Sequence, residues 1–477
     1  MKSILRRTRW LVWPLTSLAL AGAAGAPLLH PKEAAPSDWP VERFVRNLEA
    51  RLAAAPEDAD AHYTLGRVHA FAFALERATL LGGGSEEFTW LKDLEAQRTH
   101  RPEEPAPPPT PAERLAHLCE GVRHLRRACE LEDSALHRLT FAWLLETGAP
   151  LAAGVDTATL LGLEAPESSA ERETIARWIE ALGSESPTEV AEARRRLAEP
   201  PKLARAVAQL AAQRSSGDPR RRAAVDELLR SAWVERALAE YRRCLDLVEE
   251  QGLFEDPMLL GPMASQVPRE ALEAYRRLVR ARGVRGADEE RSLAQADARW
   301  KELEEKPQRA WVTPILLALE GCATLAELTR PALHVPFDLD GDGVDELWPW
   351  LAPDAGWLVW DPSGKGEILS GRQLFGSASG WLFFEHGYRV LDALDDDRDG
   401  ELRGAELAGI AVWFDRDADG VSDRGEVVTA EALGIVALAT EAAEQSGASL
   451  GNPCGLGLAD GRILPTYDWL LKPAPTP

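Results

Sequence analysis

The chain has 477 residues, of which 45% are hydrophobic and 27% are charged. This composition is typical of globular proteins, and the length allows two or three domains. The formal net charge of −23 excludes a generally basic surface of the kind that binds nucleic acid or anionic membranes. We therefore expect no nucleic-acid partner, and we expect solubility, cation binding or a basic partner instead.

Residues 1–26 have the pattern of a secretory signal peptide. Basic residues between Lys2 and Arg9 precede the apolar run WLVWPLTSLALAGAA, and Ala21, Gly22 and Ala23 form a small-residue cleavage site. An uncleaved anchor is the alternative, but the run is short for a membrane crossing. We expect an exported protein, periplasmic, cell-surface or extracellular, with no membrane span after signal cleavage.

Residues 27–148 carry helical periodicity, interrupted by a proline-rich linker at 101–111. The spacing predicts a helix over 56–74, with Asp58 or Asp60 placed to cap its start. Residues 110–148 predict two antiparallel helices broken at Glu132 and Asp133. Residues 149–310 continue as amphipathic helices with arginine-rich, solvated faces.

The first of these helices resembles a tetratricopeptide repeat, because Leu65 and Gly66 follow a helix start after Pro56. The pair over 110–148 looks like a second, weaker copy. The resemblance implies a protein-binding scaffold, so we expect a protein partner of unknown identity.

The same helices carry cysteines and histidines without a recognisable metal pattern. Cys119 lies near His117 and His124, but this spacing does not converge on one helical face, so we interpret the three as core packing. Cys119 and Cys129 stand about 15 Å apart along one helix, too far to form a disulfide with each other. The nine histidines offer no converging pair.

After residue 330 the chain becomes rich in Trp, Gly and Asp, and residues 331–470 are predicted to form an α+β domain. Four short runs have strand character: HVPFDL, ELWPWL, GWLVWD and IVALA. The predicted fold class is therefore a mainly α N-terminal helical-repeat scaffold followed by an α+β domain with tandem EF-hand-like loops.

Two segments of this domain match the calcium-loop pattern D-x-[DN]-x-[DN]-G-x5-E at every required position. Acids at positions 1, 3 and 5 converge as the chain curls, glycine at 6 permits the turn, the position 7 carbonyl adds an oxygen, and Glu at 12 closes the sphere. In the 395 loop (residues 395–406) the expected ligands are Asp395, Asp397, Asp399, the Glu401 carbonyl and Glu406. In the 415 loop (residues 415–426) they are Asp415, Asp417, Asp419, the Val421 carbonyl, Asp423 and Glu426.

Two other segments match less well. The 338 loop (residues 338–346) opens with Asp338, Asp340 and Asp342, and Glu346 is its only candidate to close a weaker site. The 361 loop (residues 361–366) keeps the spacing but has Lys365 where an acid is needed. Turn-forming Asp and Gly chemistry is the alternative to metal binding, but it explains neither Glu406 nor Glu426.

The tandem resembles EF-hands, and more narrowly the loop-helix pair of dockerin modules, with residues 407–414 as a shared helix whose inner face holds Ile410 and Phe414. The resemblance implies calcium-stabilised folding or adhesion outside the cytoplasm, and the alternative is calcium-dependent docking of a protein partner. A third, weaker reading is a haloacid-dehalogenase-like phosphatase with Asp338 as nucleophile and Asp340 as acid/base. We expect calcium as the cofactor, no catalytic residue, and no enzyme activity.

Overall fold

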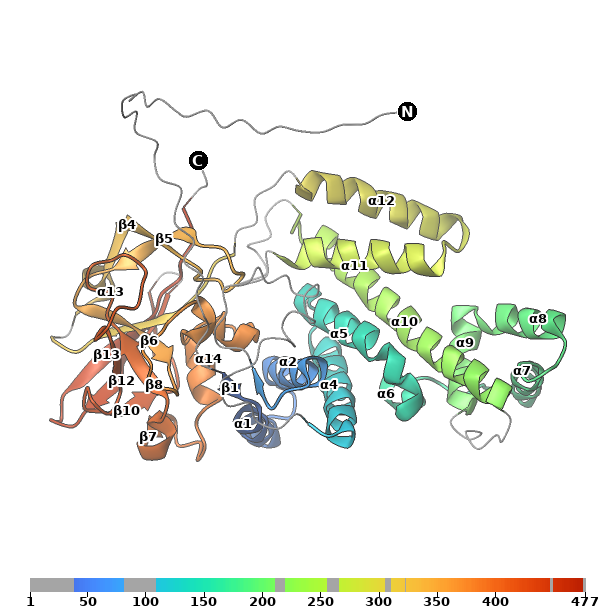
Figure 1. The fold of residues 1–477 in the computed structure, drawn as a ribbon, viewed down its shortest axis with the longest axis horizontal. Coiled ribbons are helices and arrows are strands. Elements are labelled where there is room, and N and C mark those ends of the chain that lie inside the picture. The colour runs from blue at the N-terminus through green and yellow to red at the C-terminus, as the bar shows by residue number, and fades with distance from the viewer. Residues whose placement is uncertain are drawn as a thin grey trace, which may run out of the picture. The chain divides into compact units, whose positions relative to one another are not determined.

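The computed structural model describes residues 38–80, 109–210, 219–254, 266–304, 310–321, 323–446 and 449–474. The expected signal peptide and residues 101–108 of the proline-rich linker lie outside these ranges. The described residues belong to one compact unit, Glu33–Pro477. It contains an N-terminal helical region and a C-terminal domain built on a curled sheet (Figure 1).

The helical region begins with α1, and the helix predicted over 56–74 follows it as α2. Asp58 caps α2 by accepting a hydrogen bond from the Ala61 N–H at 2.9 Å, and Thr110 forms a capping box with Glu113 at the start of α4. The predicted break at 132–133 separates α4 from α5. The bounds are α1 (Val41–Ala54), α2 (Ala59–Leu75), α4 (Pro111–Leu131) and α5 (Ala135–Gly148), with strands β1 (Trp39–Pro40) and β2 (Thr79–Leu80) paired beside them.

Helices continue to residue 304, as the periodicity predicts. They bury one apolar stripe each, and α10 packs along α5 and α11. Among the described helices, none is both long enough and apolar enough to cross a membrane. Their bounds are η1 (Ala149–Gly154), α6 (Thr157–Leu161), α7 (Ser169–Ala181), α8 (Pro187–Leu197), α9 (Pro200–Leu210), α10 (Pro219–Glu250), α11 (Val267–Arg282) and α12 (Gly286–Glu304).

The C-terminal domain is a nine-stranded antiparallel sheet with the order β7-β10-β12-β13-β3-β6-β8-β9, in which β11 pairs with β12. A separate hairpin is formed by β4 and β5. The four predicted strand runs fall on β4, β5, β6 and β10. The bounds are β3 (Ile315–Ala318), β4 (Thr329–Phe337), β5 (Glu346–Leu351), β6 (Ala355–Trp360), β7 (Glu401–Arg403), β8 (Ile410–Trp413), β9 (Val427–Thr429), β10 (Ile435–Ala439), β11 (Glu444–Ser446), β12 (Ser449–Leu458) and β13 (Ile463–Asp468).

Short helices connect the strands. The segment before the 395 loop contains a short helix whose residues Val390 and Leu391 are buried, and Leu394, which follows the helix, is buried too. Because β3 lies in the sheet, the sheet starts before residue 331, where the sequence places the domain boundary. The short helices are α13 (Leu325–Leu328), η4 (Gly371–Gln373), η5 (Ser379–Trp381), α14 (Gly387–Asp392) and η6 (Gly404–Leu407).

The segment between the two acidic loops is a strand, so the predicted shared helix over 407–414 is wrong. Gly409, with φ of +87°, ends the short turn η6, and the apolar residues that follow form β8 between β6 and β9. All four residues of β8 are buried. An apolar run this short fits a buried strand as well as a helix, and pairing on both sides decides the outcome.

The helical region contacts the sheet domain through its first residues. The Trp39 indole donates from Nε1 to the Arg372 carbonyl at 2.9 Å and stacks on Trp360 at a ring separation of 4.9 Å. Arg67 of α2 donates to the Trp381 carbonyl at 2.8 Å. These side chains are buried, so the two regions share part of one core.

Candidate metal centres

The 395 loop curls around its first carboxylate. Asp395 accepts hydrogen bonds from the Arg398 N–H at 2.6 Å and from the Gly400 N–H at 3.0 Å. Arg398 and Gly400 both have positive φ, +59° and +90°. Glycine is favoured at the second of these positions because it enters the left-handed region without strain.

The 415 loop repeats this arrangement. Asp415 accepts from the Ala418 N–H at 2.8 Å and from the Gly420 N–H at 3.0 Å, and Ala418 and Gly420 have φ of +59° and +77°. The two segments therefore have the same backbone at equivalent positions, although their other residues differ.

The acidic side chains of each loop converge. The 395 loop brings one oxygen each of Asp395, Asp397 and Asp399 within 4.8 Å of one another. The 415 loop does the same with two overlapping groups: Asp415, Asp417 and Glu426; and Asp417, Asp419 and Asp423. Glu401 and Val421, whose carbonyls we predicted as ligands, follow the loop glycines, and their N–H groups donate to Asp399 at 2.9 Å and Asp419 at 2.8 Å.

The glutamates at position 12 occupy equivalent places. Glu406 accepts from the Asp396 and Arg403 N–H groups at 2.6 and 2.8 Å. Glu426 accepts from the Arg416 and Asp423 N–H groups at 2.8 and 3.1 Å. Both side chains are mostly buried. Glu426 belongs to a converging group of acids. Among the described residues, Glu406 is not part of the acidic group of its loop, and its carboxylate accepts hydrogen bonds from backbone N–H groups.

Burial opposes ionisation of the first carboxylate of each loop. Burial raises the pKa of Asp415 to about 6, against the opposing hydrogen bonds from Gly420 and from the Trp350 indole. Burial likewise raises the pKa of Asp395, against hydrogen bonds from Gly400 and Arg398. Trp350, on β5 and fully buried, donates to Asp415 Oδ2 at 2.7 Å. A bound cation would favour the charged form of both carboxylates.

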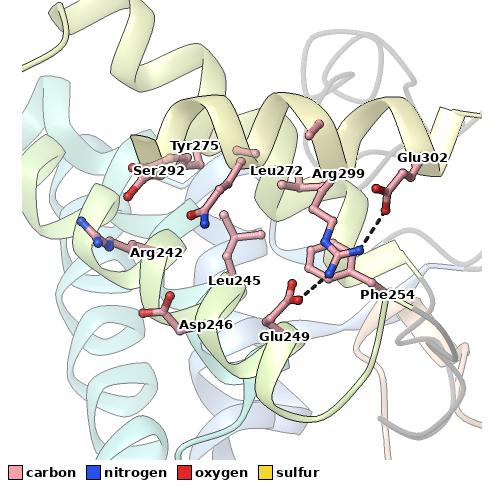
Figure 2. A pocket seen from close by; sticks show the side chains of 13 residues that line it. Arg242, Leu245, Asp246, Glu249, Phe254, Leu272, Tyr275, Ser292, Arg299 and Glu302 are labelled. Carbon is pink, nitrogen blue, oxygen red and sulfur yellow. Dashed lines mark hydrogen bonds and ion pairs between the residues drawn. The ribbon is translucent and has the colours of Figure 1, made fainter. Parts of the chain in front are cut away.

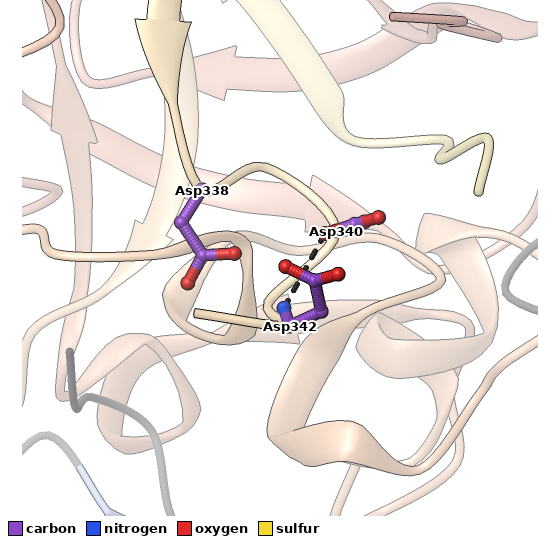
Figure 3. A group of neighbouring side chains, drawn as sticks. All are labelled: Asp338, Asp340 and Asp342. Atoms are coloured by element: carbon purple, nitrogen blue, oxygen red, sulfur yellow. Dashed lines mark hydrogen bonds between the residues drawn. The ribbon is translucent and has the colours of Figure 1, made fainter. Parts of the chain in front are cut away.

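The 338 loop forms a third acidic group at the end of β4, in which Asp338, Asp340 and Asp342 lie within 4.8 Å (Figure 3). Asp338 and Asp340 are each 3% exposed, and neither carboxylate oxygen of Asp338 has a hydrogen-bond partner among the described residues. Burial raises the pKa of Asp338 to about 7, although the charge of Arg372 opposes the shift. The orphaned oxygens fit a cation, and the nearby guanidinium weakens the attraction.

Glu346, the predicted closing residue of the 338 loop, starts β5 and is not part of that converging group among the described residues. Burial and the charges of Asp342 and Asp338 raise the pKa of Glu346 to about 8. The hairpin that carries these acids is antiparallel, whereas the phosphatase reading needs an alternating strand-helix domain after Asp338.

The 361 loop has the same shape as the acidic loops. Gly364 and Gly366 have φ of +65° and +74°, and the Gly366 N–H donates to Asp361 Oδ2 at 2.8 Å. Its third and fifth positions are Ser363 and Lys365. The loop therefore keeps the backbone turn and lacks the set of acids.

Side chains of helix α1 donate hydrogen bonds to the 395 loop. Arg43 donates to the Leu394 carbonyl at 2.5 Å and the Glu406 carbonyl at 3.3 Å, one at each end of the loop. Asp396, which is not a predicted ligand, accepts from Arg43 Nε at 2.9 Å, Arg46 Nη2 at 2.6 Å and Asn47 Nδ2 at 2.9 Å.

Sequence reasoning missed these supporting residues because they lie some 350 positions from the loop that they contact. Trp350 was missed for a related reason, since its hydrogen bond spans 65 positions. The sequence does place Arg43 and Asn47 on one face of α1, but polar residues on one helix face are also typical of a face exposed to solvent.

The statement that the histidines offer no converging pair is also wrong. His62 and His124 approach Nδ1 to Nδ1 at 2.9 Å, and His69 and His117 at 2.8 Å. The signal was a seven-residue spacing on both helices, His62 to His69 and His117 to His124, which repeats every two helical turns.

A separate pocket of about 370 Å³ lies between α10, α11 and α12 (Figure 2). Among its charged groups, Arg299 binds Glu249 and Glu302. The predicted ligands lie elsewhere, on the loops of the sheet domain.

Comparison with known proteins covers the domain that holds the acidic loops. A family model described as the SPM domain matches residues 317–460. Over 131 residues, 26% of this chain, the sequence is 34% identical to the iron-regulated protein FrpA of Neisseria meningitidis serogroup C. The chain spans only 12% of the length of that relative.

Proposed function

We propose that the C-terminal domain binds calcium at the 395 and 415 loops, and that the ions mainly stabilise the domain in an exported scaffold or interaction protein. The observation that carries the proposal is the repetition. Two segments twenty residues apart have the same backbone turn and the same hydrogen bonds to their first aspartate, and each gathers three or more acids.

The donor set fits calcium because every candidate ligand is a carboxylate or carbonyl oxygen, and such hard donors favour calcium or magnesium. Calcium accepts six to eight oxygens in flexible geometry, whereas magnesium demands a small octahedron. The acids and carbonyls of each loop would hold the ion, with Glu406 and Glu426 free to exchange backbone hydrogen bonds for metal ligation. The 338 loop would bind more weakly because Arg372 already balances part of its charge.

An exported location suits this role. Extracellular calcium modules commonly have dissociation constants of about 10⁻⁴ to 10⁻³ M, so such sites are largely filled outside the cell. Export and the absence of catalysis remain part of the proposal. The neighbouring carboxylates repel one another without an ion, and calcium removes that repulsion where β8 joins the two loops.

The test is a calcium titration of the full chain by isothermal calorimetry. Asp395→Asn should remove one of the stronger sites, Asp415→Asn the other, and the double variant should lose both. The control is Asp354→Asn, an exposed acid in the turn between β5 and β6, which should titrate like the wild type. An unchanged titration in the double variant would refute the site assignment.

A further inference from the structure

Four histidines form a ladder between α2 and α4, far from the acidic loops in sequence. His62 and His69 lie two turns apart on α2, and His117 and His124 lie two turns apart on α4. The helices run antiparallel, so His62 meets His124 and His69 meets His117. The rings of His69 and His124 are parallel within 11° at a separation of 6.2 Å, which links the two pairs.

Glycines bring the helices close enough for these contacts. A Cβ atom at Gly66 of α2 would stand 2.7 Å from Leu125 Cγ, and one at Gly121 of α4 would stand 2.8 Å from Leu144 Cδ2 and 3.4 Å from the Gly66 carbonyl oxygen. No larger side chain fits at either position without displacing its neighbours. The short helix separation is therefore built into the sequence and sets the histidine nitrogens face to face.

The protein satisfies the ring nitrogens unequally, because His62 contacts His124 through Nδ1 and the Pro56 carbonyl through Nε2 at 3.1 Å. In each pair one Nδ1 must donate and the other accept, so each contact uses one proton and one lone pair. His69 Nε2 is buried with no hydrogen-bond partner among the described residues. Neutral imidazole is the form that binds metal.

We propose that this ladder binds a borderline divalent transition cation of the Zn²⁺ class, with each Nδ1 pair as the chelating unit. Two imidazole nitrogens on one tetrahedral zinc stand about 3.4 Å apart, given Zn–N distances of about 2.0–2.1 Å. The pairs stand at 2.8 and 2.9 Å, so each must open by about half an ångström, and its rings must turn until both lone pairs point at the ion. Imidazole favours Zn²⁺, Ni²⁺ and Cu²⁺ over calcium, which makes the ladder chemically distinct from the acidic loops.

Acidic residues lie beside the ladder. Glu113 and Glu120 precede His117 and His124 by one helical turn, and each interacts electrostatically with the histidine that follows it. They increase the attraction for a cation, and solvent reaches the His62 pair because His62 is only partly buried. His117 and His124 are also partly buried, so each pair has a solvent-facing member, and His69 is the most buried of the four.

The experiment is a Zn²⁺ titration of the full chain in buffer saturated with calcium, so that the acidic loops are occupied. The variants are His62→Gln with His124→Gln, and His69→Gln with His117→Gln. The control is His334→Gln, an exposed histidine on β4. The loop variant, which combines Asp395→Asn with Asp415→Asn, shows how much of the Zn²⁺ is bound by the acidic loops.

We expect the wild type, the His334→Gln variant and the loop variant to bind the same number of Zn²⁺ ions, and each histidine-pair variant to bind one ion fewer. Co²⁺ substitution should give visible absorption in the wild type that falls to about half in either pair variant. The single His62→Gln variant, changed at a partly exposed position, should also lose the site of its pair, and unchanged calcium binding shows that a variant is folded. The same number of bound Zn²⁺ ions in all variants, or no binding by the wild type, would overturn the proposal and leave the histidines as hydrogen-bonded packing.

Discussion

Replacing Asp396 by alanine should weaken the attachment of α1 to the 395 loop without removing a predicted ligand. The carboxylate accepts three hydrogen bonds, from Arg43, Arg46 and Asn47. The Arg46 contribution is small, because the side chain is 60% exposed and surface pairs contribute about 0–1 kcal/mol. Arg43 is 13% exposed, and a hydrogen bond to a charged group contributes about 1.5–3 kcal/mol.

Asn47 adds a further penalty. It is 2% exposed, and its Nδ2 group would keep only its bond to the Ala393 carbonyl at 3.1 Å, while its Oδ1 still accepts from Arg46 Nε at 3.2 Å. Since the three contacts share one carboxylate oxygen, their contributions are not additive. We expect Asp396→Ala to lower the free energy of unfolding by about 2–3 kcal/mol.

The assay is urea denaturation followed by circular dichroism in saturating calcium. Arg46→Ala is the matched control and should cost less than about 1 kcal/mol. The cycle of Asp396→Ala with Arg43→Ala should show a coupling of about 1 kcal/mol or more. A stability loss below about 0.5 kcal/mol for Asp396→Ala, or strict additivity in the cycle, would refute the reasoning.

Three further changes test the loop geometry and the buried ionisable groups. Gly400→Ala should lower the free energy of unfolding by about 1–2 kcal/mol, because the position has a positive φ. Gly420→Ala should lower it by about 1–3 kcal/mol more, because a Cβ there would stand 2.4 Å from the Pro336 carbonyl oxygen, whereas Gly400 has open space. Equal losses of stability for the two variants in denaturation would contradict this prediction. Trp350→Phe removes the hydrogen bond to Asp415 and should weaken calcium binding at the 415 loop about tenfold in calorimetry, with the 395 loop unchanged. Burial lowers the pKa of His386 to about 4, whereas histidine in the unfolded chain has a pKa of about 6.5. The free energy of unfolding should therefore be highest above pH 6.5 and fall on acidification, by about 2 kcal/mol at pH 5. His386→Gln should reduce this fall relative to the His334→Gln control, and parallel pH profiles of the two variants would contradict the prediction.

The acidic loops were predictable because their chemistry is local. Six consecutive residues, from Asp395 to Gly400, set both the turn and the first three carboxylates, and the four strand runs likewise carry their own pattern. The position of Glu406 beside its group was not predictable, because it depends on which backbone N–H groups the folded loop leaves free.

The strand β8 and the histidine ladder were missed for a different reason. Residues 407–414 have helical spacing, and only pairing with β6 and β9 makes Ile410–Trp413 a strand. The ladder needs two helices to meet in one register, set by Gly66 and Gly121. Such long-range partners are absent from any local window of the sequence.

The strand between the loops bears on what calcium does. All four residues of β8 are buried, and the ring of Trp413 contacts Phe337 and Trp350 at separations of 5.3 and 5.8 Å. A fully buried segment cannot itself present a docking face to a partner. Calcium bound at its two ends would instead fix the position of a central strand, which favours the structural role over calcium-dependent docking.

Chelation of calcium should therefore destabilise the domain itself. With dissociation constants of about 10⁻⁴ to 10⁻³ M, calcium at about 2 mM adds about 0.7–1.8 kcal/mol of stability at each site. Thermal unfolding should shift to lower temperature when a chelator replaces calcium, and Asp395→Asn with Asp415→Asn should abolish most of the difference. A docking module would behave otherwise: calcium would leave the unfolding temperature unchanged and alter only the capture of a partner in a pull-down.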